Sequence, residues 1–301
     1  MKKMLKEKYL ELSRKGAAFI KKGNFRQAYE SYSAAKDIAL RLQSKELFHK
    51  CIANMSLVQT ELGDYKKAER GLRDIIINSI DNRIICAASY SLAISLRKQG
   101  RYIQALKYAR IAMQKSIALN DLDARAKVHN LIGNIYLYQT YIDNAITEYA
   151  KALSLREMEN TDNRFSMAIL KENIGYCHIL KKNYEKGIAI IREALKLALL
   201  TGNRRCTADC YQDICYAYML VRKLKSAEKL GERALKLAFE KEYEDIVKNC
   251  YYLLGEINFL RGHKEKMNEY FQKLQEFYPH LPFLKDFLSK FDVSEIITLK
   301  Q

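Results

Sequence analysis

A small side chain recurs at one position in seven successive repeats of this chain, and it constrains the fold more than any other feature. A second position, small in six of the seven repeats, follows twelve residues later, and an apolar position, alanine in five of the seven, follows after seven more. The first positions are Gly16, Ser56, Ala93, Gly133, Gly175, Cys215 and Gly255. The second and third are Ala28 and Ala35, Ala68 and Ile75, Ala105 and Ala112, Ala145 and Ala152, Gly187 and Ala194, Ala227 and Ala234, and Met267 and Leu274. Because both offsets hold in all seven repeats, the register reflects one structural element used repeatedly.

Each repeat predicts two antiparallel helices joined by a tight turn. Residues 23–25, 63–65 and 100–102 are each a glycine, a polar residue and an aromatic residue, a pattern typical of a turn between helices. Helices approach each other closely only where the crossing side chains are small. The two prolines, Pro279 and Pro282, are near the end, so almost the whole chain is free to be helical. One pair cannot bury its own apolar faces, so the pairs must stack.

The repeats resemble the tetratricopeptide repeat. The fourth repeat is the best match, with Leu-Ile-Gly-Asn-Ile-Tyr at residues 131–136 followed by Ala145, Tyr149 and Ala152. The resemblance extends over about residues 9–280. It implies an all-α fold, a right-handed α-solenoid of seven helix pairs plus a C-terminal capping helix after Pro282.

The repeats are longer than the usual 34 residues of that family. The small positions recur every 37 to 42 residues, with the excess between pairs, which predicts longer second helices. This repeat length resembles that of the repeat arrays in kinesin light chains, in the spindle-orientation adaptor with leucine-glycine-asparagine repeats, and in bacterial peptide-sensing regulators. We expect one solenoid domain over residues 1–301, with no effector domain before the first pair. The expected boundaries are about 9–48, 49–85, 86–125, 126–167, 168–207, 208–247 and 248–281, with a cap at 282–301.

The resemblance implies that the first helices of the pairs line a peptide-binding surface. Positions close to the small residue of these helices carry Asn, Gln and Tyr through the middle repeats. Amides both donate and accept hydrogen bonds, and Tyr supplies rigid contact area with a polar tip. The alternative is that these side chains only face solvent. The predicted peptide-binding residues are Tyr90, Lys127, Asn130, Asn134, Asn173, Tyr176, Gln212 and Tyr216.

The carboxylate clamp of chaperone-binding relatives is not expected. Asp209 and Asp213 occupy the positions that should supply its cations, and their charges would repel a carboxylate.

Neither a metal site nor catalysis is expected from the sequence. Cys206 and Cys210 share a helix face and could supply two ligands of a zinc site. Cys177 and His178 lie one repeat away. Cys215, however, occupies a small crossing position, and cysteine commonly packs as a small apolar residue. We find no glycine-rich phosphate loop and no nucleophile elbow. The prediction is therefore no catalytic residue, no metal and no cofactor.

The composition leaves three classes of function. The leading one is a scaffold or adaptor that binds a peptide segment of a partner protein. The second is a regulatory peptide sensor that controls an effector, and the third is nucleic-acid association through a surface of net charge +17. No apolar run approaches 18 residues, so no membrane partner is expected. Seven irregularly spaced cysteines favour the cytoplasm.

Overall fold

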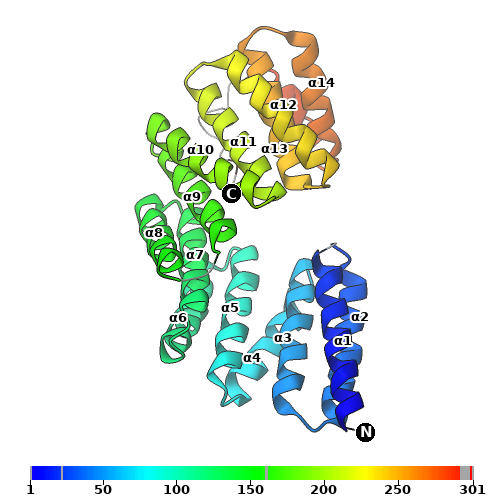
Figure 1. The fold of residues 1–301 in the computed structure, drawn as a ribbon. Coiled ribbons are helices and arrows are strands. Elements are labelled where there is room, and N and C mark those ends of the chain that lie inside the picture. Colours follow the sequence, from blue (N-terminus) through cyan, green and yellow to red (C-terminus); the bar gives the residue numbers. More distant parts are fainter. Residues whose placement is uncertain (1, 22, 160–161, 292–298, 300–301) are drawn as a thin grey trace. The chain divides into compact units, whose positions relative to one another are not determined.

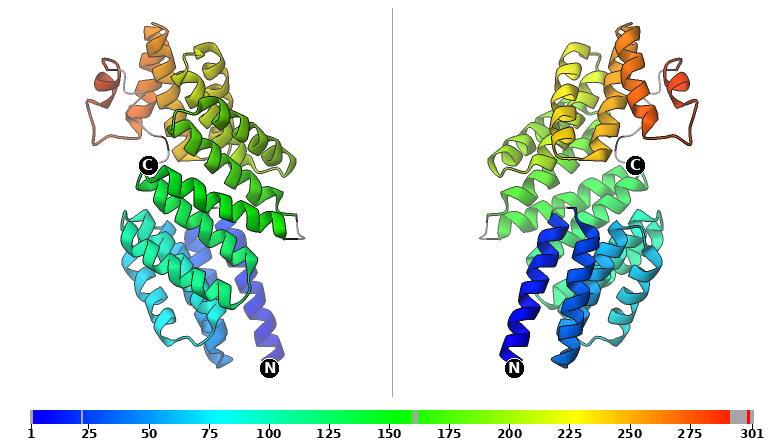
Figure 2. Two further views of the ribbon diagram at one scale, coloured as in Figure 1. Left: turned by 90° about the vertical axis from the view of Figure 1, so that its left-hand side faces the viewer. Right: turned by 90° about the vertical axis from the view of Figure 1, so that its right-hand side faces the viewer.

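The computed structural model describes residues 2–21, 23–159, 162–291 and 299, which contain fifteen helices and no strand (Figure 1). The first fourteen helices form seven consecutive pairs, and the two helices of a pair run antiparallel, as α1 and α2 (blue) do in Figure 2. The helices are α1 (Lys2–Lys21), α2 (Phe25–Arg41), α3 (Lys45–Glu61), α4 (Tyr65–Asn78), α5 (Asn82–Lys98), α6 (Tyr102–Ala118), α7 (Leu122–Tyr138), α8 (Ile142–Met158), α9 (Arg164–Leu180), α10 (Tyr184–Leu200), α11 (Arg204–Leu220), α12 (Leu224–Glu240), α13 (Glu244–Leu260), α14 (Lys264–Glu276) and α15 (Leu284–Leu288). The predicted seven-pair helical fold is confirmed.

Helix length explains the long repeat. Nine successive helices, α5 to α13, have 17 residues each, and most of the turns between them have three. First and second helices are equally long in this region, so the extra residues are shared between them. The sequence predicted longer second helices, and the structure shows that the first helices share the extra length. The twelve-residue spacing between the two crossing residues of a pair is the same in every repeat. The extra residues therefore lie at the far ends of the two helices, next to the turn that joins one pair to the next.

The turns end the helices in the left-handed backbone conformation. Glycines take this conformation at Gly23, Gly63, Gly100 and Gly262, with φ between 72° and 79°. At Gly100 the closing hydrogen bonds run from Gly100 N to Arg97 O and from Arg101 N to Leu96 O, both 2.9 Å. This pattern satisfies carbonyl groups that the end of a helix would leave free. The predicted turn role of these glycines is confirmed.

The second to seventh pairs begin about one turn earlier than expected, and side-chain caps are present at several of these starts. α11 begins at Arg204, whereas the sixth repeat was expected to begin at residue 208. Asn203 accepts a hydrogen bond from Cys206 N at 3.1 Å, and Ser44 accepts one from Leu47 N at 3.3 Å before α3. Capping side chains of this kind fix where a helix starts. The expected boundaries were set from the small crossing residues, which lie in the interior of a helix. They therefore do not locate the residue at which the helix starts.

The chain divides into two compact units, an N-terminal unit of residues 1–135 and a C-terminal unit of residues 136–301. In the C-terminal unit, α9 and α10 cross at Gly175 and Gly187, where the two backbones come too close to admit a β-carbon. Cys215, Ala194 and Ala234 are fully buried in the same unit. In the N-terminal unit Ala28, Ala68 and Ala105 are fully buried. The packing role predicted for the small residues is confirmed at these positions.

The helix expected after Pro282 is present but short. α15 has five residues, contacts α14, and buries only Leu288 among its side chains. Phe283, Phe287 and Phe291 remain more than half exposed. Within the expected 282–301 cap, residues 292–298, 300 and 301 lie outside the described residues.

No helix among the described residues combines the length and the apolar content needed to cross a bilayer.

Candidate functional site

In the N-terminal unit the predicted residues lie on two first helices. Tyr90 is on α5, and Lys127, Asn130 and Asn134 are on α7 at spacings of three and four residues. Such spacings place side chains on one face of a helix. Lys127 is exposed and the other three are partly exposed. This half of the predicted set is therefore accessible from solvent.

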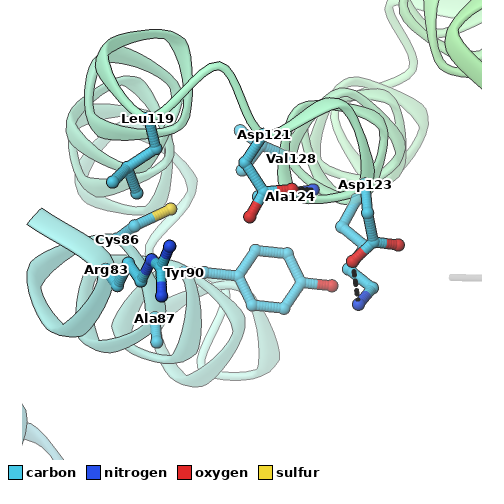
Figure 3. A pocket seen from close by; sticks show the side chains of 10 residues that line it. Arg83, Cys86, Ala87, Tyr90, Leu119, Asp121, Asp123, Ala124 and Val128 are labelled. Carbon is cyan, nitrogen blue, oxygen red and sulfur yellow. Dashed lines mark hydrogen bonds and ion pairs between the residues drawn. The ribbon is translucent and has the colours of Figure 1, made fainter.

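A cavity of about 390 Å³ brings Tyr90 and Lys127 together. Its wall combines apolar and charged side chains of α5, α7 and the turn before α7. Figure 3 shows the ring of Tyr90 extending from α5 toward Asp123 of α7. Lys127 donates a hydrogen bond to Asp123 Oδ2 at 2.6 Å, which holds the lysine beside the cavity. The lining residues are Arg83, Cys86, Ala87, Tyr90, Leu119, Asp121, Asp123, Ala124, Lys127 and Val128.

The predicted residues of the C-terminal unit are buried. Tyr176 and Gln212 are each 1% exposed, and Asn173 and Tyr216 also have less than a tenth of their surface accessible. A polar side chain that only faced solvent would keep most of its accessible surface. Other parts of the chain therefore cover these side chains.

The backbone of Leu299 reaches this buried surface. Its amide donates a hydrogen bond to Tyr176 Oη at 3.0 Å, and its carbonyl oxygen accepts one from Asn249 Nδ2 at 3.1 Å. Tyr176 is on α9 and Asn249 on α13, while α11 contacts both of these helices. Leu299 therefore lies across α11, and the two side chains satisfy both polar groups of its backbone.

The side chain of Leu299 is part of the apolar core. Only 7% of the residue is exposed, and it belongs to the same buried cluster as Tyr176, Tyr216 and Tyr252. Burying a leucine contributes roughly 1.5–3 kcal/mol. We call Tyr176, Asn249 and the buried leucine between them the Leu299 site.

The predictions missed Asn249 and Leu299. Asn249 could have been found, because it lies six residues before the small residue Gly255, as Lys127 lies before Gly133 and Asp209 before Cys215. Leu299 lies beyond the last repeat, so no periodic signal points to it.

Buried carboxylates occur on the first helices of the C-terminal unit. Asp213 on α11 and Glu256 on α13 are completely buried, and Glu172 on α9 is 4% exposed. Asp209 is paired with Arg205, whose Nε lies 3.7 Å away. The three buried carboxylates thus lie on three successive first helices.

The cysteines pack as core residues. All seven are buried, and Cys210 and Cys215 are fully inaccessible. A hydrogen bond with Cys206, together with burial, raises the pKa of Cys210, and burial raises the pKa of Cys215. Such thiols carry little of the thiolate that binds metals. No group of three or more metal-ligating side chains occurs among the described residues.

The stacked helix pairs define an α-solenoid repeat protein. Its fourth and fifth pairs match the family model of the tetratricopeptide repeat at residues 126–157 and 170–199. The resemblance to the tetratricopeptide repeat that the small-residue register predicted is confirmed in these two pairs.

Proteins of known structure share this fold. RapI in its apo form has a TM-score of 0.68 at 15% identity, covering 89% of this chain and 96% of that chain. A Rap protein complexed with Competence and Sporulation Factor has a TM-score of 0.64 at 15% identity, covering 98% of this chain and 79% of that chain.

Sequence similarity also extends to a synaptic protein. The 43 kDa receptor-associated protein of the synapse of Tetronarce californica is 22% identical over 241 residues, 78% of this chain and 57% of that protein. The chain spans about half the length of the curated relatives it matches.

Proposed function

We propose that the chain is a binding protein of the cytoplasm that takes an extended peptide segment of a partner protein on its first helices. The observation that carries this proposal is the Leu299 site, where Tyr176 and Asn249 satisfy a backbone amide and a backbone carbonyl. Side chains that read both backbone groups of one residue recognise polypeptide of any sequence, and an adjacent apolar pocket adds sequence preference. The function is binding and not catalysis.

The remaining predicted residues extend this surface within each unit. In the C-terminal unit, Asn173 lies on α9 with Tyr176, and Gln212 and Tyr216 lie on α11, which contacts both α9 and α13. In the N-terminal unit, the cavity beside Tyr90 and Lys127 has the volume of a small-ligand pocket and fits one side chain of a peptide. Asn130 and Asn134 continue that face along α7.

Selection from a random peptide display library against the full chain tests the proposal, because it requires no knowledge of the partner. Selected peptides should lose about tenfold in affinity when Asn249→Ala or Tyr176→Phe is added to a Leu299→Asp chain, in which Leu299 no longer competes for these two side chains, since each change removes one hydrogen bond to the peptide backbone. Fluorescence anisotropy measures these affinities. Asn144→Ala, at an exposed position on α8, is the matched control and should change nothing. Peptides whose affinity is unchanged by both groove variants would contradict the proposal.

A regulatory sensor is the second candidate function. Its support is the fold shared with a Rap protein that was solved in complex with Competence and Sporulation Factor. Both functions begin with the same binding step, so the peptide selection serves both. A sensor would additionally change the affinity of the chain for an effector when peptide binds.

A further inference from the structure

The chain occupies the Leu299 site with a residue from outside its own repeats. Leu299 lies 23 positions beyond the end of α14, the last helix of the seven pairs. It nevertheless fills a site whose polar groups come from α9 and α13, the first helices of the fifth and seventh pairs. Leu299 is therefore bound as a ligand would be, by its backbone and by one apolar side chain.

We propose that Leu299 is an internal ligand of the first-helix surface, and that a partner peptide must displace it. This inference rests on the proposed function and adds the chemistry of the ligand. The partner presents a branched aliphatic residue, and its backbone amide and carbonyl replace those of Leu299 at Tyr176 and Asn249.

Covalent attachment makes Leu299 a strong competitor. A tethered ligand acts at an effective concentration on the order of millimolar when its linker spans the distance. If the Leu299 segment itself binds with a dissociation constant of about 10 to 100 μM, it occupies the site in most molecules, and a partner peptide must compete with it. Removing the internal ligand should strengthen binding in trans by roughly 10- to 100-fold, without any new contact.

Leu299→Asp removes the internal ligand selectively. An aspartate side chain would be placed in an apolar cluster, so the cost of removing its charge from water expels it. Leu299→Ala is the milder second variant, because it only removes apolar contact. Leu281→Asp is the matched control. It makes the same change of charge in the same unit, but at a position that is 46% exposed.

The experiment uses full-length chains and a fluorescent peptide with the sequence of residues 292–301 as the probe. Anisotropy should show that the probe binds Leu299→Asp and Leu299→Ala roughly 10- to 100-fold more tightly than the unchanged chain or Leu281→Asp. A probe carrying the Leu299→Asp change should not bind. Circular dichroism melting confirms that each variant is folded.

Equal binding of the probe to the unchanged chain and to Leu299→Asp would overturn the inference, and so would absence of binding to Leu299→Asp. The display-selected peptides separate this failure from failure of the proposed function. If they bind the unchanged chain and Leu299→Asp equally well but still depend on Tyr176 and Asn249, the proposed function holds and the internal ligand is refuted. If no selected peptide depends on those residues while the probe binds Leu299→Asp, the internal ligand holds without a partner in trans.

Discussion

Gly175→Val should destabilise the C-terminal unit by about 3 kcal/mol or more. A β-carbon at Gly175 would lie 2.9 Å from the carbonyl oxygen of Gly187 and would overlap the side chain of Ile191. The carbonyl belongs to the backbone of α10, so relief requires that the two helices move apart. Separation would open the core on both sides of the crossing, where Ile179 and Ile191 are almost completely buried. The midpoint of urea denaturation, followed by circular dichroism, measures the loss.

The matched control for this change is Ala189→Val. Ala189 is exposed on the same helix as Gly187, so a valine there costs only its weaker helix propensity, a few tenths of a kcal/mol. A denaturation midpoint that is the same for Gly175→Val and Ala189→Val would show that α9 and α10 do not cross at the glycine pair.

The native thiols should react with N-ethylmaleimide at pH 8 at least about 100-fold more slowly than the same thiols in the unfolded chain. The thiolate is the reactive form, and a pKa rise of one unit removes about nine-tenths of it. Burial raises the pKa of Cys51 from 9.0 to about 11, which alone accounts for a factor of about 100. Burial also raises the pKa of Cys250 well above its ordinary value. Mass spectrometry of digested samples gives the rate for each cysteine.

The pH dependence of labelling follows from the direction of these shifts. Because the folded pKa of Cys51 is raised, its labelling rate should keep rising about tenfold per pH unit between pH 8 and 10. A cysteine introduced at Ser154, an exposed position on α8, is the control and should level off near its ordinary pKa. Rapid labelling of Cys206 and Cys210 in the folded chain would contradict their role in packing and revive the zinc hypothesis.

Much of the fold could be predicted because helix packing has a short period. Gly175, Gly187 and Cys215 were placed at crossings by their spacing alone, since only small residues allow two backbones to approach. Helix ends were less predictable. They depend on single side chains such as Asn203, whose hydrogen bond to Cys206 N starts α11 one turn before the expected boundary.

The candidate site was only partly predictable for a related reason. Periodicity places Tyr176 and Gln212 on one face of their helices, but it does not say which segment of the chain covers that face. The contact between Leu299 and Tyr176 joins residues 123 positions apart in sequence, outside any repeat. Such contacts depend on tertiary packing, and no local pattern encodes them.

The central claim is that Tyr176 and Asn249 recognise the backbone of a bound peptide. A crystal structure of the full chain with a display-selected peptide at saturating concentration tests this claim most directly. The account predicts a peptide residue whose amide donates to Tyr176 Oη and whose carbonyl oxygen accepts from Asn249 Nδ2, with Leu299 displaced. A peptide bound to the second helices α10 and α12, with Leu299 still joined to Tyr176 and Asn249, would contradict it.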